Sequence, residues 1–188
     1  MSEWDNRGQD LLNQGNNAWD KGERLKAEEF FRLLVQDFPE RPEGYSKVGM
    51  IMAETGRLDD AEQYFLRALT QDRNHSPALT NLGNIYLERG NIDEAIKYYL
   101  LALQNDPDYP PAHRNLSVAY KRQGRYSAYV SHFKRSQRLE NRRTREAFRL
   151  RGKSSTAGER RTAPRLPSFV WLVMLLIGVA LIVSVLHR

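Results

Sequence analysis

Histidine is the residue in this chain with the widest catalytic range, because a neutral imidazole can act as a base or bind a metal ion. The four histidines are His75, His113, His132 and His187. None has metal-binding or catalytic spacing to another histidine or to a carboxylate. The sequence contains no cysteine, which excludes disulfide and thiol chemistry and leaves the redox compartment undecided. No Gly-rich phosphate loop follows a strand, so the sequence predicts a non-catalytic protein without a cofactor or metal ion.

Asparagine side chains are a second candidate for chemistry, because they recur at intervals of 34 residues or of twice that number. One series is Asn13, Asn81 and Asn115, and a second is Asn16 and Asn84. Each amide offers two hydrogen-bond donors and one acceptor group. A row of such amides can therefore pair with the backbone of an extended peptide.

The interval between these asparagines is the period of an internal repeat, which is clearest between Ser76 and Tyr109. The same register divides residues 8–143 into four units without gaps, which are 8–41, 42–75, 76–109 and 110–143. Residues 1–7 form a polar lead-in. Trp4 in this lead-in either covers the exposed flank of the first unit or belongs to a disordered start.

Each unit is predicted to be a helical hairpin. Apolar residues at positions 7, 11, 20, 24 and 27 of the unit have helical spacing. Position 15 is glycine in every unit, and glycine accepts the left-handed conformation in which many helices end. The first helices are expected near 8–21, 42–55, 76–89 and 110–123, and the second near 24–38, 58–71, 92–105 and 126–140. One hairpin cannot bury its own apolar stripe, so the hairpins should stack into a solenoid.

Small and large residues of the third unit carry a resemblance to a known family. They are Leu82, Gly83, Tyr86, Gly90, Ala95, Tyr99, Ala102 and Pro107. The pattern resembles the tetratricopeptide repeat (TPR) family, which implies an all-α solenoid of four helix–turn–helix repeats. The match weakens in the fourth unit, where Ser117, Tyr129 and Asn141 replace glycine, alanine and proline. A terminal repeat packs on one side only and is expected to be atypical.

The resemblance also implies that the first helices line a concave groove for a protein or peptide partner. The implied groove residues are Asn13, Asn16, Lys47, Met50, Asn81, Asn84, Arg114, Asn115, Lys121 and Arg122. The cations of the fourth unit make one end basic, which suits an acidic or carboxylate-bearing segment. The alternative is that asparagine is simply common at these positions in the family. The carboxylate clamp of TPR co-chaperones is not expected, because neither possible frame supplies its set of cations.

Residues 144–168 combine Gly, Ser, Thr and Pro with Arg, which predicts a helical extension to about Leu150 and then a flexible linker. Between Lys134 and Arg165, twelve Lys or Arg residues stand against three acidic ones. The cations expected at a membrane surface are Arg142, Arg143, Arg145, Arg149, Arg151, Lys153, Arg160, Arg161 and Arg165. They either bind anionic lipid headgroups or act only as a topology signal. Nucleic acid is disfavoured as a partner, because no aromatic residues interleave with the cations.

Residues 169–186 contain no charged residue and predict a transmembrane helix, with a buried or interfacial helix as the alternative. At about 1.5 Å per residue, the run is roughly 27 Å long, enough to cross a bilayer core. Phe169 and Trp171 lie at its start, where aromatic residues favour the membrane interface. Ala180 and Ser184 form a small-residue pair through which two such helices can pack, so homo-oligomerisation is an open alternative. Residues 187–188 form a short tail.

The Arg-rich flank precedes the span, so the positive-inside rule places residues 1–168 in the cytoplasm. The sequence shows no signal peptide. We therefore expect a single-pass, tail-anchored protein, in the bacterial inner membrane in preference to the mitochondrial outer or endoplasmic-reticulum membrane. The predicted function is a non-catalytic scaffold that recruits a partner through the groove. The alternative is that residues 134–168 bind anionic lipid or RNA and that the TPR domain is secondary.

Overall fold

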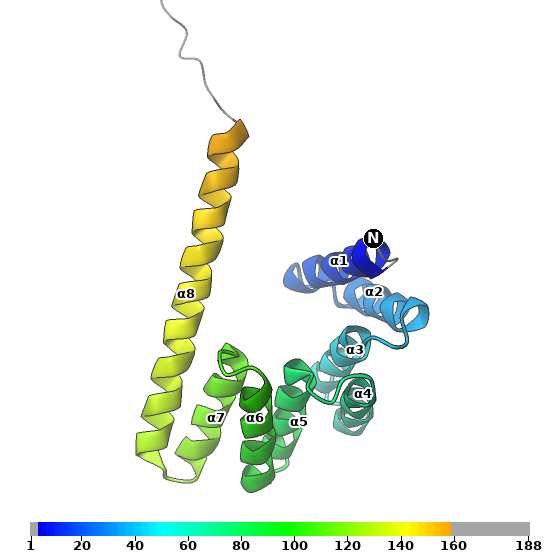
Figure 1. Cartoon of the computed structure of the whole chain (residues 1–188). Coiled ribbons are helices and arrows are strands. Elements are labelled where there is room, and N and C mark those ends of the chain that lie inside the picture. The colour runs from blue at the N-terminus through cyan, green and yellow to red at the C-terminus, as the bar shows by residue number, and fades with distance from the viewer. Residues whose placement is uncertain (1–3, 159–188) are drawn as a thin grey trace, which may run out of the picture. The chain divides into compact units, whose positions relative to one another are not determined.

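The computed structural model describes residues 4–158, apart from the side chains of residue 5 and residues 151–158. This part of the chain is entirely helical (Figure 1), and its elements are η1 (Trp4–Gly8), α1 (Gln9–Asp20), α2 (Arg24–Asp37), α3 (Pro42–Glu54), α4 (Leu58–Gln71), α5 (Ser76–Glu88), α6 (Ile92–Asn105), α7 (Pro110–Arg122) and α8 (Tyr126–Gly158). Successive helices pair as hairpins, and each hairpin packs on the next through α2 and α3, α4 and α5, and α6 and α7. The predicted all-α repeat solenoid is confirmed for these residues.

Glycines in the left-handed region end the first helix of each hairpin. They are Gly22, Gly56, Gly90 and Gly124, with φ between 74° and 82°. At the third of these ends, the N–H of Gly90 donates to the carbonyl of Leu87 at 3.2 Å, and the N–H of Asn91 donates to the carbonyl of Tyr86 at 2.8 Å. The same pair of bonds recurs at the other three ends. These bonds satisfy carbonyls that the helix itself leaves unpaired, and the predicted role of the glycines is confirmed.

Close packing inside the first three hairpins depends on a glycine in the first helix beneath an aromatic ring of the second. The pairs are Gly15 with Phe31, Gly49 with Phe65, and Gly83 with Tyr99. A Cβ atom added at Gly83 would lie 2.5 Å from Cε1 of Tyr99, closer than two such atoms can approach. All three rings are 0% exposed. The glycines therefore allow the rings to fill the space between the helices.

The fourth hairpin lacks this contact. Ser117 takes the place of the glycine, and the ring of Phe133, at the position of Phe65, is 39% exposed rather than buried. Two larger side chains explain the difference, since Ser117 carries a Cβ atom and Tyr129 replaces an alanine of the other units. The ring therefore has no space between α7 and α8.

Polar contacts add to the apolar ones that hold the first part of α8. Asp108, in the loop before α7, pairs with Arg135 and, at 3.2 Å, with Arg142. Arg114 of α7 forms an ion pair with Glu140 of α8. These partners are all partly exposed, so each pair contributes little to stability on its own. The end of the array is thus held by these ion pairs together with the apolar contacts of Ala128, Tyr129 and the buried Leu139.

The N-terminal segment packs on the first hairpin. The ring of Trp4 meets the ring of Phe38 edge-on, with centroids 5.2 Å apart, and the guanidinium of Arg41 lies 4.2 Å from the centroid of Trp4. Trp4 therefore covers the flank of the first hairpin, which is the first of the two alternatives that the sequence left open.

Helix α8 extends further than the sequence indicated. The expected end was near Leu150, but the helix continues to Gly158. A single glycine inside a helix costs only about 1 kcal/mol relative to alanine, so Gly152 does not end it. The compact unit of the repeats ends at Thr144, and α8 continues into a second unit from Arg145. Within residues 4–158, no helix is long and apolar enough to cross a bilayer. The predicted span at 169–186 lies outside the described residues.

Candidate peptide-binding groove

A hollow of about 350 Å³ lies along the first helices of the repeats. It is lined by Leu12, Asn16, Glu43, Ser46, Lys47, Met50, His75, Pro77, Asn81, Tyr109 and Pro111. These residues come from α1, α3, α5, α7 and the loops that precede α5 and α7. Apolar walls carry a few separated polar groups, which is the usual composition of a ligand site.

Lys47 is the cation of this groove. Burial lowers the pKa of Lys47, an effect that the charge of Asp20 partly opposes. Its ammonium group lies 5.6 Å from the ring centroid of Phe31. Among the described residues, no carboxylate is in ion-pair contact with it. A positive charge that is partly removed from water and has no carboxylate in ion-pair contact favours an anionic ligand group.

Glu43 gives the same hollow an acceptor. Its Oε1 accepts a hydrogen bond of 3.0 Å from Nη2 of Arg41. Its Oε2 is buried without a hydrogen-bond partner, as is Nε of Arg41. A small rotation would join these two atoms as the second bond of a bidentate pair, so the unpaired oxygen does not by itself require a ligand. Burial lowers the pKa of the neighbouring His75, which leaves its imidazole neutral near pH 7.

Three of the predicted asparagines bind one another. Nδ2 of Asn115 donates to Oδ1 of Asn84 at 2.7 Å, and Nδ2 of Asn84 donates to Oδ1 of Asn81 at 3.4 Å. The hydroxyl of Tyr99 also donates to Oδ1 of Asn84 at 2.8 Å. Burial raises the pKa of Tyr99, so its hydroxyl remains a donor. The acceptor of Asn84 is therefore used within the protein.

The three cations predicted for the basic end each have a partner within the chain. Arg114 pairs with Glu140 of α8. Nη1 of Arg122 donates to the carbonyl of Leu87 at 2.9 Å. The ammonium group of Lys121 lies 5.7 Å from the ring centroid of Tyr129. These cations are consequently less available to a ligand than Lys47.

The structure brings four of the ten predicted groove residues into the hollow, namely Asn16, Lys47, Met50 and Asn81. Asn13 is exposed on α1 outside it. The prediction did not include Glu43, Ser46, His75 or Tyr109. The second and fifth positions of each unit were a usable signal for Glu43 and Ser46. His75 and Tyr109 end their units, and nothing in the pattern indicated that a loop residue would reach the groove.

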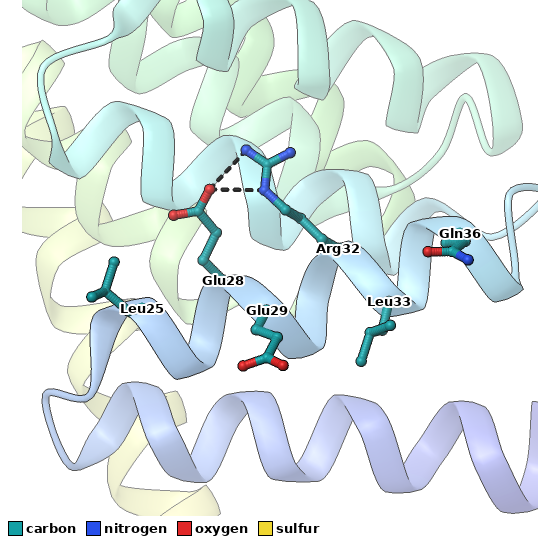
Figure 2. A pocket seen from close by; sticks show the side chains of 6 residues that line it. All are labelled: Leu25, Glu28, Glu29, Arg32, Leu33 and Gln36. Carbon is teal, nitrogen blue, oxygen red and sulfur yellow. Dashed lines mark hydrogen bonds and ion pairs between the residues drawn. The ribbon is translucent and has the colours of Figure 1, made fainter.

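A second hollow, of about 390 Å³, lies on helix α2 and is lined by Leu25, Glu28, Glu29, Arg32, Leu33 and Gln36 (Figure 2). Arg32 Nη2 and Glu28 Oε1 are 2.7 Å apart in an ion pair between successive turns. Leu25 is 84% exposed. All the lining residues belong to one helix, so groups from separate elements do not converge there. Within the described residues, no cluster of three His, Asp or Glu side chains could hold a metal ion.

Residues predicted at the membrane surface are only partly described. Arg142 and Arg143 contact Asp108, through its carboxylate at 3.2 Å and its carbonyl at 3.4 Å. Arg145 and Arg149 are exposed on α8. The side chains of Arg151 and Lys153, and the whole of Arg160, Arg161, Arg165, Phe169 and Trp171, lie outside the described residues.

Two family models match the middle of the chain. One, described as TPR repeat, matches residues 83–124, and another, described as Tetratricopeptide repeat, matches residues 52–101. No curated protein sequence matches the chain significantly. The matched residues contain α4 to α7, including the pair of Gly83 and Tyr99.

Solved structures share the fold. The protein PilF of Pseudomonas aeruginosa has a TM-score of 0.65 and 20% identity, over 74% of this chain and 64% of that one. A thermophilic TPR protein of Thermus thermophilus has a TM-score of 0.63 and 19% identity, over 71% of this chain and 74% of that one. A mutant of the O-GlcNAc transferase of Thermobaculum terrenum has a TM-score of 0.58 and 27% identity, over 64% of this chain but only 23% of that enzyme.

These matches agree with the period of the sequence and with the stacked hairpins of the structure. They support a protein-interaction fold of the scaffold type. Residues 52–124 therefore match models of the tetratricopeptide repeat family, and the described residues share the fold of the solved structures.

Proposed function

We propose that this protein is a non-catalytic scaffold that binds an extended segment of a partner protein in the groove of its repeats. The observation that carries the proposal is the hollow along α1, α3 and α5, where Lys47 is partly buried with no carboxylate against it among the described residues. Asn16 and Asn81 lie in the same hollow and can pair with a peptide backbone. A segment with an acidic side chain suits this arrangement.

The proposed scaffold is held at a membrane by residues 169–186. The support is in the sequence, which has an uncharged run of 18 residues after an Arg-rich flank. The repeats then face the cytoplasm, in a bacterial inner membrane by preference. Holding the groove at a membrane raises the effective concentration of a partner there, so the affinity of the groove itself can be modest.

Site-specific photocrosslinking tests the groove. A photoreactive residue at Asn81 should capture the partner, whereas one at Glu29, on the outer face of α2, should not. Adding Lys47→Glu to the Asn81 probe should abolish capture, provided that circular dichroism shows an unchanged melting temperature. Equal capture from Asn81 and Glu29 would show that the groove is not the binding surface.

Extraction with alkaline carbonate tests the membrane span separately. The full chain should stay with the membrane pellet, and a chain that ends at residue 168 should move to the supernatant. Release of the full chain would exclude the span and leave the groove proposal standing, since the two rest on different residues.

A second candidate function is contact between the basic part of α8 and anionic lipid. Arg145 and Arg149 are exposed and lie four residues apart on one helix, so they share a face. Cations beside an anionic bilayer contribute about 1 kcal/mol each. Binding to vesicles that contain phosphatidylglycerol, with none to RNA at the same salt concentration, would support the lipid alternative.

A further inference from the structure

Two histidines join α7 to the first part of α8. Nδ1 of His113 lies 2.9 Å from Nδ1 of His132, and the ring centroids are 5.1 Å apart. That separation is close to the largest that two imidazoles can have with their nitrogens at this distance. The two nitrogens therefore face each other along one line, as in an N–H···N hydrogen bond. A shared metal ion would require both lone pairs to point away from that line.

The neighbouring carbonyl fixes which nitrogen carries the proton. Nε2 of His113 lies 3.0 Å from the carbonyl oxygen of Pro107. A carbonyl only accepts, so Nε2 of His113 bears the hydrogen. In neutral His113, Nδ1 then has a lone pair and is the acceptor. Nδ1 of His132 is consequently the donor, and Nε2 of His132 is the position that can take up a further proton.

The surroundings of the pair disfavour positive charge. His113 is 8% exposed, and the ring of Tyr120 from α7 lies 5.6 Å from that of His132. Burial lowers the pKa of both histidines. The charge of Arg135 lowers the pKa of His113 further, whereas the bond to Pro107 and the charges of Asp108 and Asp106 raise it. His113 in turn lowers the pKa of His132.

We propose that the His113–His132 pair is a proton-operated latch that holds the first part of α8 on α7 and releases it when the pair takes up two protons. The first proton binds at Nε2 of His132, and the hydrogen bond between the rings remains. The second proton binds at Nδ1 of His113, which is the acceptor of the hydrogen bond between the rings, and converts it into a donor. Two N–H groups on two cations then face each other at contact distance.

The apolar packing that opposes the release comes from Ala128 and Tyr129, which lie against the cluster of Leu116, Ala119 and Tyr120, and from the buried Leu139, and it lacks the central buried ring of the other hairpins. Phe133, which would be central to the hairpin, is 39% exposed. The remaining contacts are mainly the partly exposed pairs Asp108–Arg135 and Arg114–Glu140. Arg135 and Arg142 lower the pKa of Asp108, so its ion pairs persist while the histidines titrate. The latch requires neither a groove partner nor the membrane span.

The direction of the pH dependence follows from the lowered pKa of each histidine. The docked state binds fewer protons than the released state between these lowered values and the ordinary histidine pKa of about 6.5. Docking is therefore complete above that range and weakens as the pH falls through it. For each proton that the docked state lacks, a fall of one pH unit within this range makes the release about tenfold more favourable.

Hydrogen exchange of the full chain, in non-ionic detergent, tests the latch. At about pH 7.5 the amides of residues 126–144 should be protected; at about pH 5, after correction for intrinsic rates, they should exchange at least about tenfold faster relative to α3 and α4. His132→Asn is the matched control, because its amide nitrogen can replace Nδ1 as a donor without titrating. His75→Asn controls for a histidine elsewhere.

The expected result is a pH-dependent loss of protection in the wild type and in His75→Asn, but not in His132→Asn. The ¹⁵N shifts of the imidazoles should in addition show His113 with its proton on Nε2 and His132 with its proton on Nδ1 at the higher pH. The same pH-dependent loss in His132→Asn, or unchanged protection in the wild type, would overturn the proposal. So would the opposite assignment of the two tautomers.

Discussion

Oδ1 of Asn84 on α5 accepts a hydrogen bond of 2.7 Å from Nδ2 of Asn115 on α7, and so connects two neighbouring repeats across the inner face of the array. The same oxygen accepts from the hydroxyl of Tyr99. An asparagine that was predicted to meet a peptide therefore has a structural role. Ligand binding and stability can be separated at this position by experiment.

We expect Asn84→Ala to reduce the free energy of unfolding by about 1–2 kcal/mol, because the hydroxyl of Tyr99 and the amide of Asn115 lose their acceptor. Asn13→Ala is the matched control, since it makes the same change of helix propensity at an exposed position. Its effect should stay within about 0.5 kcal/mol. Urea unfolding measures both, and equal effects would show that the network of amides contributes nothing.

Gly83→Ala should destabilise the protein by about 1–3 kcal/mol, because the new Cβ atom would lie 2.5 Å from the ring of Tyr99. Ser117→Ala, at the same repeat position in the fourth hairpin, should change the melting temperature by much less. There the helices already accommodate a Cβ atom. A Gly83→Ala protein as stable as the wild type would mean that the first three hairpins can open to admit a methyl group.

Lys47→Met should retain the shape of the groove and remove its cation. Because burial lowers the pKa of Lys47, the folded protein binds fewer protons than the unfolded chain between that lowered value and the ordinary lysine pKa. Stability of the wild type should therefore rise with pH across this interval, and Lys47→Met should lose that rise. Unfolding by urea at several alkaline pH values measures it, with Lys97→Met as an exposed control.

The same variant tests the chemistry of the ligand. Loss of one charge-assisted hydrogen bond costs about 1.5–3 kcal/mol, so Lys47→Met should bind a partner segment with an acidic residue at least about tenfold more weakly. Replacing that acidic residue by its amide should weaken binding to the wild type but not to Lys47→Met. Fluorescence anisotropy with labelled peptides measures the affinities. If the losses of affinity from Lys47→Met and from the peptide substitution were additive, Lys47 and the acidic residue of the peptide would not be in contact.

Reversal of two charges on α8 tests the lipid alternative. Arg145→Glu combined with Arg149→Glu should weaken binding to phosphatidylglycerol vesicles by well over about tenfold, since each cation contributes about 1 kcal/mol. Lys97→Glu, on the repeat array, changes one charge as a control and should have a small effect. The measurement is sedimentation with vesicles by the full chain, compared with neutral vesicles that report binding through the apolar span alone. Equal losses of vesicle binding in all variants would show that the net charge of the protein, and not Arg145 and Arg149, attracts it to the vesicles.

The repeat period was sufficient to predict the regular part of the fold. The glycine at position 15 of each unit indicated where the first helix ends, whereas the contact of Gly83 with the ring of Tyr99 was found only in the structure. Departures in the fourth unit were visible at Ser117, but the period could not show that Phe133 would turn outward.

The candidate site was harder to predict, because its residues are decided by partners on other helices. Lys47 and Asn81 lie in the hollow, whereas Arg114 meets Glu140 of α8. That pairing depends on how α8 lies against α7, which the period does not specify. The length of α8 was also missed, since a single glycine such as Gly152 costs only about 1 kcal/mol relative to alanine and does not end the helix.

The fourth hairpin has charged pairs where the other hairpins bury a ring, so the two ends of the array should differ in their resistance to force. In a stack of repeats, each hairpin is supported only by its neighbours. Tension applied through the C-terminal end of the chain reaches the α7–α8 junction first, and this junction lacks the glycine–ring contact of the first three hairpins. Under tension α8 should peel away before the glycine–ring hairpins yield. The groove along α1, α3 and α5 would then remain assembled while the end of the array acts as a compliant tether.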